Sequence, residues 1–361
     1  MPGNCGGSHT RALAATISLR TCRGKVCTGP RARHNGMAHL AALEHARLSL
    51  VHWERYYRSG ALACWPGGAG GSYDLEVRES WAVFFAGLPE GARILDIGTG
   101  NGAVALIASE TAQLLGRHFE IHGSDLASID PRRDVPDGSV RMADIVFHPR
   151  VATESLPFES SSFDAVSGQY ALEYAPIAAA LGEIHRVLRT AGRAQFILHH
   201  ENSQFVCNAR ESLVQAQLVL NETRVLGRLR RYLDSLRNSA GTAHHRRWRD
   251  LKDAIQTLRR AATAAGTPWV LGVTLDAIEK LLAARGEMTL ASLDLEVERF
   301  ERDLRASVWR LQDLVRAARS EIGIVEIEQM AAAAGFEIER RAPQVHNRVN
   351  LVGWLLILSR R

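Results

Sequence analysis

The sequence has few of the features that mark membrane-spanning or disulfide-stabilised proteins. Its 361 residues include five cysteines, an odd number, and no stretch approaches the roughly 18 consecutive apolar residues of a bilayer-crossing helix. The longest strongly apolar run, residues 351–358, has the length of a single strand. We therefore expect no membrane span, and a reducing cytoplasm as the location.

Lysine is scarce, and acidic residues are missing from the start of the chain. Only three of the 44 basic residues are lysine, and residues 1–43 hold six basic side chains and no acid. Setting these six aside leaves 38 basic residues against 39 acidic ones, a charge of −1, although the whole chain carries +5. The body of the protein has no net positive charge, and we do not expect a nucleic-acid partner.

The first 36 residues also lack any sustained hydrophobic period. They are expected to be a disordered tail or an over-extended start, with Met37 opening the protein; an organelle-targeting segment is the remaining alternative. Cys22 and Cys27 have neither the spacing of zinc ligands nor a second pair, so no metal site is expected.

From about residue 92 the chain alternates short apolar runs with helical patterns. A helix is expected at 177–189, and strands are expected near 92–97, 117–127, 163–174 and 192–200. Strands that alternate with helices predict an α/β fold with a doubly wound, mostly parallel sheet.

Residues 201–320 interrupt this rhythm with long helical patterns, including 213–236 and 290–316. The α/β pattern then resumes with a helix and strand at 327–342 and a last strand at 350–360. We expect a large all-helical insertion after the fifth strand. The predicted domains are N-terminal helices at 37–80, one α/β domain made of 81–200 and 321–361, and the insertion at 201–320.

A glycine-rich turn, Gly98, Gly100 and Gly102, follows a strand and precedes an Ala-rich helix. Glycines let a ligand approach the backbone, and the helix start offers free N–H groups. The string also fits the looser dinucleotide pattern, but Asp96 would repel a pyrophosphate, and no residues for hydride transfer are evident. Asp125, at the end of the next strand, suits a ribose in either cofactor.

Five motifs together resemble the class I S-adenosylmethionine-dependent methyltransferases, of the small-molecule, ubiquinone/menaquinone-biosynthesis type. They are "ILDIGTGNG" (94–102), "GSDLA" (123–127), "ADI" (143–145), "LPFESSSFDAV" (156–166) and "EIHRVLRTAGR" (183–193). The resemblance implies a Rossmann-like, seven-stranded fold and S-adenosylmethionine as the cofactor. It covers roughly residues 80–200 and 325–361.

The resemblance also assigns cofactor contacts to residues of this chain. It places the methionine part against the glycine turn and the fourth strand's exit, the ribose on one acid and the adenine on another. The residues placed against the methionine part are Asp96, Gly98, Gly100, Gly102, Gln169 and Tyr170. Asp125 is placed at the ribose hydroxyls, and Asp144 at the adenine amino group. An unusually long spacer, residues 146–156, follows Asp144.

Methyl transfer from a sulfonium needs mainly positioning, so no catalytic residue follows directly from the sequence. The candidates after the fourth and fifth strands are Tyr170, His199 and His200, with Glu173 and Glu201 beside them. A histidine such as His200 is suited to deprotonate a hydroxyl. The acceptor is expected to be a small molecule methylated on O, N or C by in-line displacement.

The insertion carries a basic cluster between Arg224 and Arg260, with eleven basic residues against three acids. This cluster supports two alternatives: an RNA methyltransferase, or a non-catalytic S-adenosylmethionine-binding or interaction protein. A solvated helix face explains the same charges. The insertion is otherwise expected to cover the acceptor or to form a homodimer.

Overall fold

The computed structural model describes residues 50–64, 71–236 and 242–361. The expectations for residues 1–36, the start at Met37 and the pair Cys22 and Cys27 lie outside the described residues. Within the described part, no helix combines the length and the apolar character needed to cross a bilayer.

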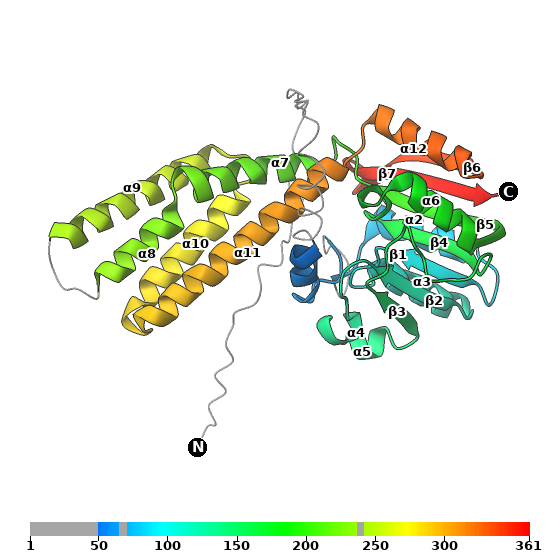
Figure 1. The fold of residues 1–361 in the computed structure, drawn as a ribbon, viewed down its shortest axis with the longest axis horizontal. Coiled ribbons are helices and arrows are strands. Elements are labelled where there is room, and N and C mark those ends of the chain that lie inside the picture. The colour runs from blue at the N-terminus through cyan, green and yellow to red at the C-terminus, as the bar shows by residue number, and fades with distance from the viewer. Residues whose placement is uncertain (1–49, 65–70, 237–241) are drawn as a thin grey trace, which may run out of the picture.

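A seven-stranded sheet forms the centre of the protein (Figure 1). Its order is β3-β2-β1-β4-β5-β7-β6; β1 to β5 run parallel, and β7 is antiparallel to both of its neighbours. The strands are β1 (Arg93–Ile97), β2 (Glu120–Asp125), β3 (Ile145–Pro149), β4 (Phe163–Gln169), β5 (Leu188–Leu198), β6 (Phe336–His346) and β7 (Asn350–Arg360). The predicted Rossmann-like, doubly wound and mostly parallel sheet is confirmed.

Helices cover both faces of this sheet. On one face α2 (Leu75–Ala86) packs against α3 (Ala103–Leu115), and on the other α6 (Ile177–Val187) packs against α12 (Glu321–Ala333). The central strands β1, β2 and β4 are buried along almost their whole length, as expected for parallel strands covered by helices on both faces. Three short elements complete this part: α4 (Pro131–Asp134), α5 (Gly138–Arg141) and the 3₁₀ turn η2 (Leu172–Tyr174).

The chain between β5 and α12 forms a helical arm with its own apolar core. Figure 1 shows the arm as an elongated body that extends away from the sheet. Its helices are α7 (Gln204–Gln217), α8 (Val225–Ser235), α9 (Thr242–Ala264), α10 (Trp269–Ala283) and α11 (Leu290–Ala317). The expected all-helical insertion after the fifth strand is confirmed.

One long helix expected in the arm, 213–236, is broken. The α-helix ends at Gln217, passes into a π-helical turn, η3 (Leu218–Glu222), and resumes only at Val225. The backbone N–H and the hydroxyl of Thr223 both donate to the carbonyl of Leu218, and Arg224 adopts a left-handed φ of 49°. A hydroxyl that competes for helix carbonyls and a left-handed residue both end regular helix.

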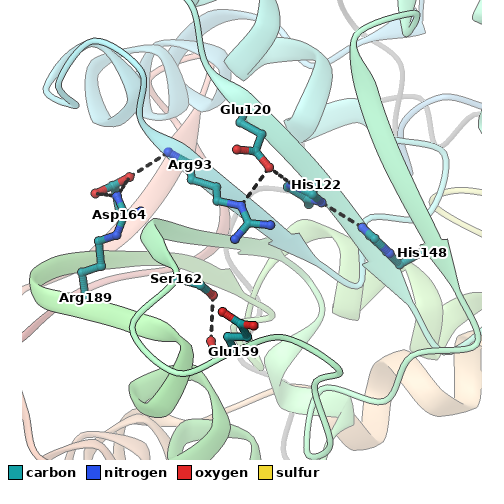
Figure 2. A network of polar contacts seen from close by, with 8 residues as sticks. All are labelled: Arg93, Glu120, His122, His148, Glu159, Ser162, Asp164 and Arg189. Carbon is teal, nitrogen blue, oxygen red and sulfur yellow. Dashed lines mark hydrogen bonds and ion pairs between the residues drawn. The ribbon is translucent and has the colours of Figure 1, made fainter.

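A network of polar contacts joins the first residues of β1, β2 and β4 (Figure 2). The Arg93 guanidinium donates to Glu120 at 2.9 Å, and the Arg93 backbone N–H donates to Asp164 at 2.8 Å. Glu120 also contacts His122 at 2.8 Å, and His122 lies 2.9 Å from His148. These contacts join β1, β2 and β4 near their amino ends, and the contact between His122 and His148 adds β3 to the network.

Candidate functional site

A cavity of about 850 Å³ lies at the carboxyl ends of β1, β2, β4 and β5. This is the edge at which open α/β sheets bind their ligands. Three parts of the chain line most of the cavity: the N-terminal segment 50–64, the strand ends with their loops, and the arm, through α7, α11 and residues 266–269 at the start of α10. The volume lies in the range of small-molecule sites, roughly 300–1,000 Å³.

The glycine turn forms the floor of this cavity next to β1. Gly98, Gly100 and Gly102 have φ values of 55°, 52° and 82°, a region that L side chains rarely adopt. A Cβ atom on Gly100 would lie 2.7 Å from the Tyr57 ring. Gly98 and Gly100 line the cavity, whereas Gly102 begins α3 and faces Phe147.

Two buried carboxylates lie beside the turn. Asp96 accepts hydrogen bonds from the hydroxyls of Thr99 at 2.6 Å and Ser167 at 2.8 Å. Asp125 accepts from the backbone N–H groups of Gly100 at 2.9 Å and Ala127 at 2.8 Å. Burial raises the pKa of Asp96 to about 7 and that of Asp125 to about 6. A bound ligand that carries a positive charge or donates hydroxyl hydrogen bonds would stabilise the charged carboxylates and lower these pKa values again.

The helical residues 50–57 cover the turn from the opposite side. Tyr57 lies against Gly100, interacts with the Asp125 carboxyl group and stacks on Trp53 with ring centroids 5.9 Å apart. Trp53 in turn makes an edge contact with Tyr174 of η2 at 5.9 Å. These aromatic side chains therefore line the cavity as well as filling space.

The wall formed by β4, η2 and β5 is also aromatic and polar. Tyr170, with a left-handed φ of 55°, stacks on His199 and donates its hydroxyl to the carbonyl of Val352 at 2.9 Å. Gln169 accepts from the Trp81 indole N–H at 2.6 Å. The Glu173 carboxylate accepts from the His199 backbone N–H at 2.7 Å. The structure thus brings Gln169, Tyr170 and His199 together, as the strand exits predicted.

Two expected residues lie elsewhere. Asp144 is exposed and precedes β3, so it sits at the amino end of that strand, away from the cavity. His200 stacks on Trp354 with ring centroids 4.4 Å apart and is absent from the cavity lining. Asp144, expected to contact the adenine, and His200, a candidate base, therefore both lie outside the site.

Sequence reasoning missed the contribution of α11. Arg310 lines the cavity with its guanidinium 4.8 Å from the Tyr56 ring centroid, and it donates to Ser307 at 3.2 Å. Burial lowers the pKa of Arg310, whose charge nevertheless persists because arginine titrates far above neutrality. No local pattern marks Arg310 among the many arginines of the arm; only the packing of α11 on the N-terminal segment identifies it.

Comparisons with known proteins agree with this geometry. Residues 95–196 match the family model described as a methyltransferase domain. No curated protein sequence matches the chain significantly.

Similar solved structures include three from bacteria. YcgJ from Bacillus subtilis is 25% identical over 37% of this chain and 58% of its own, with a TM-score of 0.29. An S-adenosylmethionine-dependent methyltransferase from Mesorhizobium loti is 23% identical over 35% and 54%, with a TM-score of 0.28. The 1,6-didemethyltoxoflavin-N1-methyltransferase of Burkholderia thailandensis is 13% identical over 92% and 93%, with a TM-score of 0.42. The chain spans less than two thirds of the first two proteins.

Proposed function

We propose that the protein is a class I S-adenosylmethionine-dependent methyltransferase and that it transfers a methyl group from this cofactor to a small-molecule acceptor. The match of residues 95–196 to a methyltransferase domain supports this proposal. The observation that carries the proposal is the pair Asp96 and Asp125, buried on either side of a left-handed glycine turn at one cavity edge. When bound, the cofactor supplies an activated methyl group.

The residues present fit this cofactor. Asp125, at the end of β2, would accept the ribose hydroxyls, and the glycine turn would let the methionine part approach the backbone. The Asp96 carboxylate suits the cofactor's positive charge. Asn101 offers a buried carbonyl oxygen for which the described residues provide no donor, while its amide nitrogen is held by the carbonyls of Tyr57 and Ala61.

The protein's task in such a transfer is to position the acceptor in line and to exclude water. The aromatic side chains of the N-terminal segment and η2, together with Phe205 and Trp269 from the arm, enclose the cavity. This enclosure supports methylation of an O, N or C atom of a small molecule. The cysteine content supports a cytoplasmic location for the reaction.

An RNA acceptor has weaker support, because acids of the arm oppose part of the basic cluster. Arg230 pairs with Asp294 and Glu298 of α11, each at 3.2 Å, and Arg259 pairs with Glu279 of α10 at 2.7 Å. A homodimer through the arm remains a proposal, which light scattering on the purified protein would test.

Calorimetric titration tests the proposed function. We expect S-adenosylmethionine and its demethylated product to bind, NAD not to bind, and labelled methyl groups to reach at least one acceptor in a small-molecule library. Binding without transfer to any acceptor would favour a non-catalytic cofactor-binding protein. Binding of NAD alone would overturn the proposal.

A further inference from the structure

Three residues of the β4–β5 wall have a polar atom without a partner in the described part of the chain. These atoms are Nε2 of Gln169, Oε2 of Glu173 and Nδ1 of His199, and all three residues line the cavity. Leaving a buried polar atom without a hydrogen bond costs free energy, so such atoms are rare in folded proteins unless a ligand or water meets them. Three on one wall mark a place for a polar group.

The remaining atoms of these side chains are held by the fold. Trp81 fixes Gln169, the His199 backbone N–H fixes Oε1 of Glu173, and the Tyr170 ring covers His199 face to face. The free atoms are therefore presented in defined positions rather than on mobile side chains. Gln169 offers a donor and the Glu173 carboxylate offers an acceptor, while Nδ1 of neutral His199 donates or accepts according to its tautomer.

Glu173 and His199 differ in their capacity to take a proton. Burial raises the pKa of Glu173 to about 7, whereas burial lowers that of His199 to about 3. The groups facing Glu173 are His199, the Tyr170 and Tyr174 rings, and Arg319, which donates to the Glu173 carbonyl at 3.0 Å. Near neutral pH, Glu173 is matched to proton transfer and His199 is not.

The rest of the cavity describes the molecule that would meet these atoms. Aromatic side chains from the N-terminal segment, η2 and the arm offer flat apolar walls, which suit a ring-sized acceptor. Arg310 adds a buried positive charge in the same cavity, which would stabilise an anion.

We propose that Glu173 is the general base of the transfer and that the acceptor is a flat molecule whose reacting atom carries an acidic O–H or N–H proton. This inference rests on the proposed function. The O–H or N–H bond breaks, its electron pair stays on the acceptor atom, and the proton passes to Oε2 of Glu173. The carboxylate becomes a neutral carboxylic acid, and Arg310 supplies the compensating charge for the anion.

The proton can be followed without the cofactor. The probe is 3-nitrophenol, a flat acid whose anion absorbs visible light, added at about pH 7.5, where Glu173 is mainly ionised. In the wild-type protein we expect the probe to produce the visible band of the anion and, in the same titration, to increase the infrared band of protonated carboxyl groups. In Glu173→Gln this increase should be missing, and in Glu173→Asp it should appear at a shifted frequency.

Turnover supplies the second measurement, with acceptors found in the labelled-methyl screen. We expect Glu173→Gln to lower kcat by about 100-fold or more, leave cofactor affinity unchanged and remove the rise of the rate with pH near 7. Glu201→Gln is the matched control, because Glu201 lies next to the same wall but outside the cavity lining; it should change none of these.

The outcomes separate the two proposals. If the wild-type protein binds no S-adenosylmethionine, the proposed function fails. If it binds the cofactor and transfers methyl groups, yet Glu173→Gln turns over at the wild-type rate, the base assignment is overturned. No binding of 3-nitrophenol at millimolar concentration, or a visible band without an increase in the carboxyl band, also overturns it. Because the infrared signal is read from the wild-type protein, it does not depend on the folding of a variant.

Discussion

The rings of Tyr170 and His199 are stacked with centroids 4.0 Å apart and an angle of 2° between their planes. The stack joins the exits of β4 and β5, two neighbouring parallel strands, at the wall of the cavity. Tyr170 keeps its left-handed backbone because its N–H donates to the carbonyl of Ile197 and its hydroxyl to that of Val352. Backbone strain of this kind persists where surrounding contacts hold it, and it is concentrated at functional sites.

Replacing this tyrosine by phenylalanine tests how the wall is held. Tyr170→Phe keeps the stack but leaves the Val352 carbonyl without its donor, so we expect the free energy of unfolding to fall by about 1–3 kcal/mol. Urea denaturation measures the change. A variant as stable as the wild type would show that the hydroxyl does not fix the wall.

The glycine turn provides a test of the cofactor site. Gly100→Val places a branched side chain against Tyr57 at the cavity floor, so we expect binding of S-adenosylmethionine to be lost. The matched control is Gly116→Val: Gly116 also has a left-handed φ, 62°, but nothing lies within 4 Å of its Cβ position. The control should lose stability through backbone strain and keep its cofactor affinity, as calorimetry would measure. Equal affinities in both variants would place the cofactor elsewhere.

The buried acids predict an unusual dependence of stability on pH. In the folded protein the pKa values of Asp96 and Glu173 are about 7 and that of Asp125 about 6, against about 4 in an unfolded chain. The folded state therefore binds more protons between these values. The stability that these groups contribute is fully present below about pH 4 and is lost as the pH rises through 6 to 7.

Asp96→Asn isolates this contribution. His199, with a lowered pKa of about 3, acts in the opposite direction, because its contribution is present above about pH 6.5 and is lost on acidification. The difference between wild-type and Asp96→Asn urea midpoints, followed from pH 5 to 8, removes the shared histidine effect. We expect the urea midpoint of the wild type to fall relative to that of Asp96→Asn as the pH rises. A difference that stays constant from pH 5 to 8 would contradict the raised pKa of Asp96.

The basic cluster of the arm separates nucleic-acid from small-molecule acceptors. We expect RNA to bind only weakly, with a Kd near or above roughly 10⁻⁴ M at physiological salt. A slope of log affinity against log salt with a magnitude of about 4 or more would imply several phosphate contacts. Submicromolar binding lost on changing Arg246, Arg247 and Arg249 to Glu would overturn the small-molecule assignment.

The sequence predicted most of the sheet because its signals are local. The strand over 350–360 follows from an uninterrupted apolar run, and the turn at 98–102 follows from glycines whose left-handed φ values no other residue adopts as easily. Asp125 was assigned from its place at a strand end, and the structure brings it to Gly100.

Three other positions could not be placed from the sequence. Asp144 is assigned to the adenine by the resemblance alone, whereas in the structure it precedes β3 and lies at the edge of the sheet opposite the cavity. His199 and His200 are adjacent, and neighbouring side chains in extended backbone point to opposite sides, so the sequence could not say which one enters the cavity. Arg310 follows His199, the last strand-end residue of the cavity wall, by more than a hundred residues. Only tertiary packing brings them together.

The two ends of the helical arm meet at the sheet. The Arg319 N–H donates to the His199 carbonyl at 2.7 Å, and the Glu201 N–H donates to the Arg319 carbonyl at 3.0 Å. The chain therefore leaves and re-enters the α/β core through one seam, and closing a loop there costs little more entropy for a long insert than for a short one. A different helical hairpin grafted between Ser203 and Ala318 would leave the pairing of β5 with β7 intact. Under the proposed function, the arm could therefore change in length and sequence, and with it the acceptor, while the strand ends and the glycine turn stay unchanged.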